Sequence, residues 1–304
     1  MEYCLITDAL CKQYRNFKAL NGLSMHVPQG SIYGLVGKNG AGKTTLIRLI
    51  SGIQEPTSGN YTLYGVKNTD KAIYKVRQRM GAVVESPAIY LDMTAEENLK
   101  IQYQVLGIPS YEGITELLQL VDLTECGKKK VKNFSLGMKQ RLGIAVALCG
   151  NPDFLVLDEP INGLDPQGII EIRELILKLN RELQITILIS SHILDELSKL
   201  ATHYGFVDRG MIVKEISAAD LDAVCRKCTR LSVTDTRILC RVLDGMGLEY
   251  NIVSNTQADV FGEISVTKLA IALDREHCEV KSMDERDESL ENYYMNLVGG
   301  GRDA

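Results

Sequence analysis

One glycine-rich stretch decides how this chain folds: Gly37-Lys38-Asn39-Gly40-Ala41-Gly42-Lys43-Thr44. It matches the pattern G-x-x-x-x-G-K-S/T at every fixed position. Residues 32–36 before it are apolar and predict a buried strand, and residues 45–50 after it predict the start of a helix. This order of strand, loop and helix is the context that the pattern requires, so we expect the loop to cradle phosphate groups.

The residue types in this stretch suit that task. A chain without Cβ atoms can turn its N–H groups inward around phosphate oxygens, and the positive end of the following helix points toward the same oxygens. Lys43 would pair with the β and γ phosphates, and the Thr44 hydroxyl would hold Mg²⁺. A glycine-rich turn with a chance lysine is the alternative, and the flanking strand and helix argue against it.

Composition narrows the class of protein. The chain has 304 residues, enough for one large and one small domain, and a net charge of -5, which gives no general basic surface for nucleic acid. No run approaches about 18 consecutive apolar residues, and residues 1–8 lack an apolar core, so we expect neither a membrane span nor a signal peptide. Eight scattered cysteines predict reduced thiols in a cytosolic protein, and the pair Cys225 and Cys228 lacks a second pair at zinc-binding spacing.

A second apolar run, residues 154–157, ends in the adjacent acids Asp158 and Glu159. Such a run predicts a buried parallel strand, and ligands bind at the carboxyl ends of these strands. Neighbouring side chains on an extended chain point to opposite sides, so the two acids can have different roles. One could support Mg²⁺, and the other could orient or deprotonate a water. A polar strand end without a function is the alternative.

Four further positions are candidates for the same site. Ser135 and Asp165 each precede a helical pattern and are good N-cap residues. Residues 186–190 predict another strand, and His192 follows it, where a histidine is more often a structural hydrogen-bond partner but a γ-phosphate contact is plausible. Tyr14 precedes the phosphate loop and could stack on a purine or cover the edge of the sheet.

The other segments before residue 150 complete an α/β pattern. Residues 1–30 predict two short strands joined by residues 12–17. Residues 60–66 predict an edge strand, and residues 80–85 predict another strand that ends in an acid. From about residue 86 to residue 150 the pattern is helical.

Two local features lie in the helical segment. Thr94-Ala95-Glu96-Glu97 resembles a capping box, which would start one of the helices. A basic run at residues 128–132 is better explained as a solvated face than as a binding patch.

The tail after residue 215 has no further nucleotide-binding pattern. It predicts a helix at 218–227, and then strand, helix, strand, strand, helix and strand from 230 to 283, which is the ferredoxin-like order. A last helix at 290–297 precedes a flexible glycine-rich end at 299–301. We expect a regulatory or dimer-contacting domain here, without chemistry of its own.

Taken in order, these motifs over residues 1–215 resemble those of the ATP-binding subunit of an ABC transporter. Gly37–Thr44 resembles the Walker A loop, and Phe134–Met138 resembles the signature. Asp158-Glu159 resembles Walker B with the catalytic glutamate, and Asn162–Asp165 resembles the D-loop. His192 resembles the switch histidine, and Tyr14 resembles the adenine-stacking aromatic.

From its own pattern, the tail at 216–304 is expected to form a small accessory α+β domain. The resemblance implies a P-loop ATPase fold over 1–215, with a helical subdomain at about 86–150. It implies ATP and Mg²⁺ as ligands, with Thr45 also in the nucleotide site. Two copies of the subunit would pair head to tail, so that Ser135 and Gly137 of one copy complete the site of the other. Asp165 of the D-loop is also expected among the nucleotide-binding residues. The subunit would lie in the cytoplasm, on the inner face of the membrane, bound to a separate permease.

Two departures from the family pattern affect the site. The usual signature L-S-G-G-Q reads Phe134-Ser135-Leu136-Gly137-Met138, which keeps the serine and the second glycine. Glu85 stands where the family generally has a glutamine that links Mg²⁺, water and the permease. A carboxylate about 4 Å from a phosphate charge costs about 4 kcal/mol at an effective dielectric constant of about 20. Glu85 is therefore expected to be a Mg²⁺ ligand that also gates coupling.

The segments around residues 32–44, 84–87 and 135–142 look most like the bacitracin or lantibiotic immunity branch, whose members export or clear peptide antibiotics. The transported molecule is not readable here, since its contacts lie on the permease. A soluble ABC-type ATPase acting on nucleic acid or ribosomes is the alternative; such proteins usually carry two cassettes or a long coiled-coil insertion, and this chain has neither. A P-loop kinase would leave the signature and the D-loop without a role.

Overall fold

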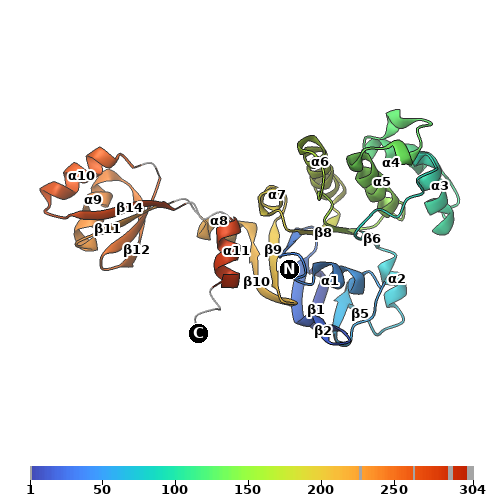
Figure 1. Ribbon diagram of the computed structural model, residues 1–304, viewed down its shortest axis with the longest axis horizontal. Helices are drawn as coiled ribbons and strands as arrows, with labels where there is room; N and C mark the ends of the chain where they lie inside the picture. The colour runs from blue at the N-terminus through green and yellow to red at the C-terminus, as the bar shows by residue number, and fades with distance from the viewer. Residues whose placement is uncertain (1, 226–227, 263, 287–289, 300–304) are drawn as a thin grey trace. The chain divides into compact units, whose positions relative to one another are not determined.

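The computed structural model describes residues 2–225, 228–262, 264–286 and 290–299. It divides into two compact units, Met1–Ala218 and Ala219–Ala304, which are described separately below (Figure 1).

The first unit is built around a six-stranded sheet. Its strand order is β10-β9-β3-β8-β7-β6, and all neighbours are parallel except β9 and β10. These strands are β3 (Ile32–Val36), β6 (Met80–Val83), β7 (Phe154–Asp158), β8 (Thr186–Ser191), β9 (His203–Asp208) and β10 (Met211–Ser217). Every residue of β3, β7 and β8 is buried, as the continuous apolar runs predicted.

A second, antiparallel sheet in this unit has the order β2-β1-β4-β5. Its strands are β1 (Tyr3–Tyr14), β2 (Phe17–Pro28), β4 (Ser58–Leu63) and β5 (Val66–Lys67). The prediction of two short strands joined by residues 12–17 was wrong, because β1 and β2 are 12 residues each and Tyr14 pairs with Phe17. The far end of this hairpin is exposed, so its residues are polar and resemble a loop in the sequence.

The predicted edge strand at 60–66 was also wrong in two respects. Tyr64 and Gly65 both have positive φ angles, 48° and 77°, and form a turn that divides the segment into β4 and β5. β4 then lies between β1 and β5 rather than at the edge of the sheet.

The helices of the first unit pack on its sheets or on one another. They are α1 (Lys43–Ile50), α2 (Ile73–Arg77), α3 (Ala95–Val105), α4 (Gly113–Leu120), α5 (Leu136–Leu148), α6 (Pro166–Leu183) and α7 (Leu194–Ser198). α3, α4 and α5 pack on one another within the segment expected to be helical (Figure 1). The capping box is present, since Glu97 N donates to Thr94 Oγ1 over 3.2 Å and Thr94 N donates to Glu97 Oε2 over 2.7 Å.

The end of the predicted helix at 218–227, residues 226 and 227, lies outside the described residues. The second unit begins within α8 (Ala218–Val224). It contains β11 (Cys228–Val233), α9 (Thr236–Met246), β12 (Glu249–Ser254), β13 (Gln257–Phe261), α10 (Val266–Arg275), β14 (Val280–Arg286) and α11 (Leu290–Gly299). Its antiparallel sheet has the order β12-β13-β11-β14, which is the strand order of a ferredoxin-like fold. Leu231, Leu243 and Val260 are fully buried in its own core. Of the glycine-rich end, residues 300 and 301 are outside the described part.

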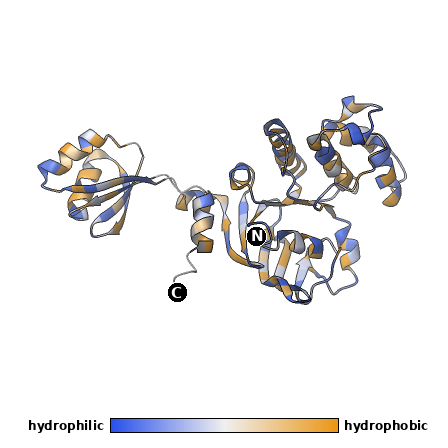
Figure 2. Ribbon diagram, viewed as in Figure 1, coloured by the Kyte–Doolittle hydropathy of each residue, from blue (hydrophilic) through white to orange (hydrophobic). Residues whose placement is uncertain are grey.

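The helices carry both hydrophilic and hydrophobic residues (Figure 2). Across the described ranges, we find no helix with the length and apolarity needed to cross a membrane.

Candidate functional site

The carboxyl ends of four neighbouring parallel strands form the edge at which the predicted residues gather. In the order β3, β8, β7 and β6, these strands are followed by Lys43, His192, Glu159 and Glu85. Parallel strands end on the same side of a sheet, so residues far apart in the sequence meet here. The contacts described below join residues that lie at these strand ends.

The phosphate loop depends on its glycines. Gly40 and Gly42 have φ angles of 81° and 111°, a region that L side chains rarely adopt. A Cβ atom on Gly42 would lie 2.7 Å from Ala19 O, and one on Gly37 would lie 2.7 Å from Val207 O. No other atom approaches within 4 Å of a Cβ placed on Gly40, so the backbone there borders open space. This arrangement fits a loop that admits phosphate groups next to its backbone.

The Lys43 side chain lies inside this loop and is only 5% exposed. Its ammonium donates to Gly37 O and, over 3.4 Å, to Lys38 O. Its Nζ atom also lies 3.2 Å from Glu159 Oε1. The structure thus brings the lysine of the phosphate loop together with the second acid of β7, as one triphosphate site requires.

Glu159 is the centre of the contacts at this edge. Its Oε2 atom lies 2.7 Å from His192 Nδ1, while Oε1 faces Lys43. Its φ angle is 51°, in the left-handed region, so the chain turns sharply after β7. The carboxylate of the preceding Asp158, 2% exposed, instead accepts a hydrogen bond from Ser190 Oγ over 2.6 Å. The two acids therefore have different partners.

Sequence reasoning missed Ser190. Its hydroxyl contacts both acids, because it also accepts a hydrogen bond from Glu159 N over 3.0 Å. The sequence feature that could have indicated Ser190 is its hydroxyl, which follows the apolar run 187–189 at the end of the strand next to the acids. The register of β7 and β8 pairs Asp158 with Ser190. The pattern of one strand alone does not reveal which residues of the next strand lie opposite it.

Glu85 lies just past β6, with a φ angle of 59° and a 57% exposed side chain. Its carboxylate forms an ion pair with Arg48 of α1, a partner that the sequence did not indicate. Thr44 and Thr45 lie in the first turn of the same helix and are half-buried. Glu85 thus has a cationic counter-charge on the helix that follows the phosphate loop.

Tyr14 ends β1 and is 37% exposed. Its hydroxyl donates to Gln54 Oε1, and Lys12 Nζ lies 5.3 Å from the centre of its ring. The ring is therefore held by its edge and has a cation near it. Both a purine-stacking role and a role at the sheet edge are compatible with this placement.

Ser135, Gly137 and Asp165 form a second group at two adjacent helix starts. Ser135 Oγ accepts from Met138 N and Asp165 Oδ1 accepts from Gly168 N, both over 3.2 Å, so the two predicted N-caps are confirmed. A Cβ on Gly137 would meet atoms of Gly168 and of the loop before α6 only at 3.9 Å. The signature segment and the segment before α6 therefore lie side by side.

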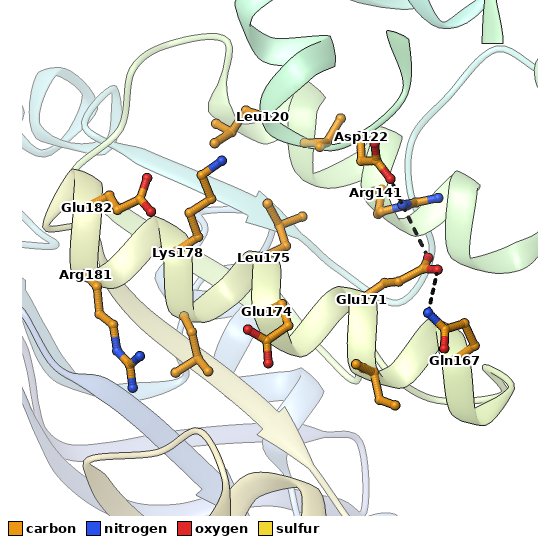
Figure 3. Close-up of a pocket in the computed structure, with 13 residues that line it drawn as sticks. Leu120, Asp122, Arg141, Gln167, Glu171, Glu174, Leu175, Lys178, Arg181 and Glu182 are labelled. Atoms are coloured by element: carbon orange, nitrogen blue, oxygen red, sulfur yellow. Dashed lines mark hydrogen bonds and ion pairs between the residues drawn. The ribbon is translucent and has the colours of Figure 1, made fainter. Parts of the chain in front are cut away.

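A pocket of about 560 Å³ lies on α6, away from the residues named above. Figure 3 shows two ion pairs and a hydrogen bond along it: Arg141 Nη1 is 3.3 Å from both Asp122 Oδ2 and Glu171 Oε2, and Gln167 Nε2 donates to Glu171 Oε1 over 3.2 Å. None of the predicted site residues lines this pocket. Arg141 of α5, the helix that carries the signature at its start, instead pairs with Glu171 of α6 and with Asp122 just after α4.

The residues present can hold a nucleotide and a divalent cation. The loop backbone and Lys43 can receive phosphate oxygens, and Thr44 and Asp158 supply oxygen atoms of the kind that Mg²⁺ prefers. The Asp158 carboxylate has one oxygen engaged by Ser190, which fixes the direction in which the group faces.

Comparisons with known proteins agree with this geometry and confirm the resemblance. The ABC transporter family profile matches residues 20–162. A bacitracin transport ATP-binding protein of Enterococcus faecalis, BcrA, is 38% identical over 99% of this chain and 98% of its own length. A lantibiotic transport ATP-binding protein of Streptococcus pyogenes, SrtF, is 43% identical over 68% of this chain and 87% of its own.

Solved structures give the same answer for the fold. The cbiO1 protein of Clostridium perfringens, part of the ABC transporter complex cbiONQ, superposes with a TM-score of 0.65 at 27% identity and covers 73% of this chain and 92% of its own. The chain therefore belongs to the ABC transporter family, as one of its ATP-binding, ATP-hydrolysing subunits.

Proposed function

We propose that this subunit powers a transporter that exports a peptide antibiotic or clears one from the membrane. The observation that carries the ATPase part is the Glu159 carboxylate, whose two oxygens face Lys43 and His192. The substrate class is supported by relatives named for bacitracin and lantibiotic transport. The alternative of an ATPase acting on nucleic acid is not favoured, because no relative named above suggests it and the net charge is -5.

We assign the residues at the strand ends to separate tasks. The loop Gly37–Thr44 would bind the phosphates, and Thr44 and Asp158 would hold Mg²⁺, with Glu85 as a further ligand. Bound Mg²⁺ would neutralise part of the phosphate charge during transfer. Glu159 would orient and deprotonate the attacking water, and His192 would hold Glu159 and contact the γ-phosphate.

The present contacts of Glu159 suggest how binding prepares the site. Phosphate oxygens would attract the Lys43 ammonium more strongly than the single Glu159 oxygen that lies 3.2 Å from it. That carboxylate oxygen would then be free to accept a proton from water. His192, 2.7 Å from the other oxygen, would keep the carboxylate in place meanwhile.

The partners follow from the second group of residues. The N-terminus of α5, capped by Ser135, offers N–H groups and a positive helix end to an anion. We propose that it completes the nucleotide site of a second copy in a head-to-tail dimer. A separate permease would hold both copies at the inner, cytoplasmic face of the membrane and would carry the substrate contacts.

The variant Glu159→Gln tests the ATPase assignment. It keeps the size of the side chain and can still hydrogen-bond to Lys43 and His192, but it removes the base and the negative charge that pairs with Lys43. Steady-state hydrolysis should fall by at least about 100-fold. Nucleotide binding should remain, and sedimentation should show a dimer that persists with ATP and Mg²⁺.

The matched control is Glu174→Gln, the same change at an exposed position of α6. This control should hydrolyse ATP at the wild-type rate. Wild-type hydrolysis by Glu159→Gln would remove Glu159 from the proposed role.

A further inference from the structure

The end of β8 carries a buried serine that the roles assigned above do not use. Ser190 is 0% exposed and follows three buried apolar residues, 187–189. In the parallel register of β7 and β8 it stands opposite Asp158. A buried hydroxyl is costly unless it is hydrogen-bonded, so its contacts should explain why it is tolerated there.

The Ser190 hydroxyl uses its donor and its acceptor on two neighbouring residues. It donates to Asp158 Oδ1 over 2.6 Å and accepts from Glu159 N over 3.0 Å. The same N–H also approaches the Ser190 carbonyl oxygen, at 3.2 Å. One side chain therefore fixes the carboxylate of the first acid and the backbone of the second.

The backbone contact matters because Glu159 has a left-handed conformation. Its φ angle of 51° is unfavourable for a residue with a Cβ atom and must be held by its surroundings. This turn directs the Glu159 carboxylate toward Lys43 and His192. The Ser190 hydroxyl is one of the two acceptors that hold the Glu159 N–H in the turn.

We infer that Ser190 is a positioning residue for ATP hydrolysis, because its hydroxyl fixes Asp158 and Glu159 relative to each other. This inference rests on the proposed roles of Asp158 in holding Mg²⁺ and of Glu159 in orienting water. Without the hydroxyl, the Asp158 carboxylate can rotate and the turn at Glu159 loses a hydrogen bond. The metal site and the water-orienting group should then both be disturbed by one substitution.

The test is Ser190→Ala, compared with Ser31→Ala. Ser31 is also buried, and its hydroxyl donates to Pro28 O over 2.6 Å, at the start of β3 and therefore at the opposite end of the sheet from the site. Ser190→Ala should lower kcat by about 10–100-fold. It should also raise the Mg²⁺ concentration for half-maximal hydrolysis several-fold.

Two readouts separate positioning from a purely structural role. Binding of a fluorescent ATP analogue without Mg²⁺ should be unchanged in Ser190→Ala, because the phosphate loop is intact. Ser31→Ala should show wild-type kcat and Mg²⁺ dependence even where its melting temperature falls. If Ser190→Ala lowers only the melting temperature, as Ser31→Ala does, the inference is overturned.

Further variants keep the result decisive. Ser190→Cys keeps the volume of the side chain and a weak donor, so its kcat and its Mg²⁺ requirement should lie between those of wild type and Ser190→Ala. If Ser190→Ala does not fold, wild-type kinetics in a folded Ser190→Cys would overturn the inference. Asp158→Asn should raise the Mg²⁺ requirement by itself. If Asp158→Asn and Glu159→Gln have their expected effects and Ser190→Ala does not, only this inference fails. If neither acid variant affects hydrolysis, the proposed function fails instead.

Discussion

The Lys43 ammonium has a carboxylate as its counter-charge, because Glu159 Oε1 lies 3.2 Å from it. A lysine that is only 5% exposed would be costly without such a partner. The same carboxylate that we assign to the attacking water thus also stabilises the buried Lys43 ammonium. Nucleotide phosphates can take over this second task, which couples their binding to the release of the Glu159 oxygen.

The ion pair of Glu85 with Arg48 leads to a prediction about Mg²⁺. If Glu85 ligates the cation directly or through water, Glu85→Gln should raise the Mg²⁺ concentration for half-maximal hydrolysis several-fold. Arg48→Gln should lower that concentration by no more than about fivefold, because exposed ion pairs contribute about 0–1 kcal/mol. Steady-state ATPase assays across a Mg²⁺ titration measure both.

The control for this prediction is Asp92→Asn. Asp92 forms another exposed ion pair, 2.9 Å from Lys132, and its loss removes one negative charge outside the site. It should leave the Mg²⁺ titration unchanged. A Glu85→Gln variant with the Mg²⁺ dependence of wild type would exclude Glu85 from the metal site.

The sequence predicted which residues meet at one site better than it predicted the other contacts of those residues. Lys43, Glu159 and His192 were expected at one site, and the structure joins them directly. Ser190 and Arg48 were not expected, because their contacts depend on strand order and on the rotation of α1. Neither property is encoded in a local pattern.

Among the secondary-structure elements, α3 offers a pH-dependent test of its cap. The pKa of Glu97 is lowered from 4.5, first by the backbone hydrogen bond from Thr94 and then by the Thr94 side chain. A carboxylate with a lowered pKa in the folded state stabilises fully above its unfolded pKa and loses that contribution as pH falls through the folded value. Glu97→Ala should therefore destabilise the protein at pH 7 and progressively less at pH below about 4.5.

The companion variant Thr94→Ala separates the two halves of the cap. It should cost about 1 kcal/mol, and its effect should persist in acid because the hydroxyl does not titrate. Denaturant unfolding at several pH values measures both variants, and hydrolysis should be unchanged in both. A Glu97→Ala loss that stays constant down to the onset of acid unfolding would contradict the electrostatic origin of the effect.

Elements with strong local signals were predicted correctly, and those without them were not. Ser135 and Asp165 start α5 and α6 as expected, since an N-cap is a contact within a few residues. The β1–β2 hairpin was too short in the prediction, because polar residues at its exposed end are compatible with strand or loop. The short helices α2 and α7 span 5 residues each, too few for a periodic pattern to stand out.

On the scale of the whole molecule, each unit has its own hydrophobic core. In the first unit the core surrounds α1 and the two sheets, with Leu46, Ile47 and Val156 fully buried. In the second unit it lies between the four-stranded sheet and its helices, with Leu243 fully buried on α9. The order of predicted elements was enough to anticipate the second fold. What that unit binds has no signature in the sequence.

Separate cores predict two thermal transitions, and nucleotide should shift only one. We expect ADP with Mg²⁺ to bind the folded first unit, so at about 100 times its dissociation constant it should stabilise that unit by about 2.7 kcal/mol. Leu243→Ala leaves a cavity in the second core, which should reduce the free energy of unfolding of that unit by about 2–5 kcal/mol. It should therefore lower the temperature of the other transition. Differential scanning calorimetry of the full chain, with and without MgADP, measures both. A single transition that both the nucleotide and Leu243→Ala move would show that the two cores unfold as one cooperative unit.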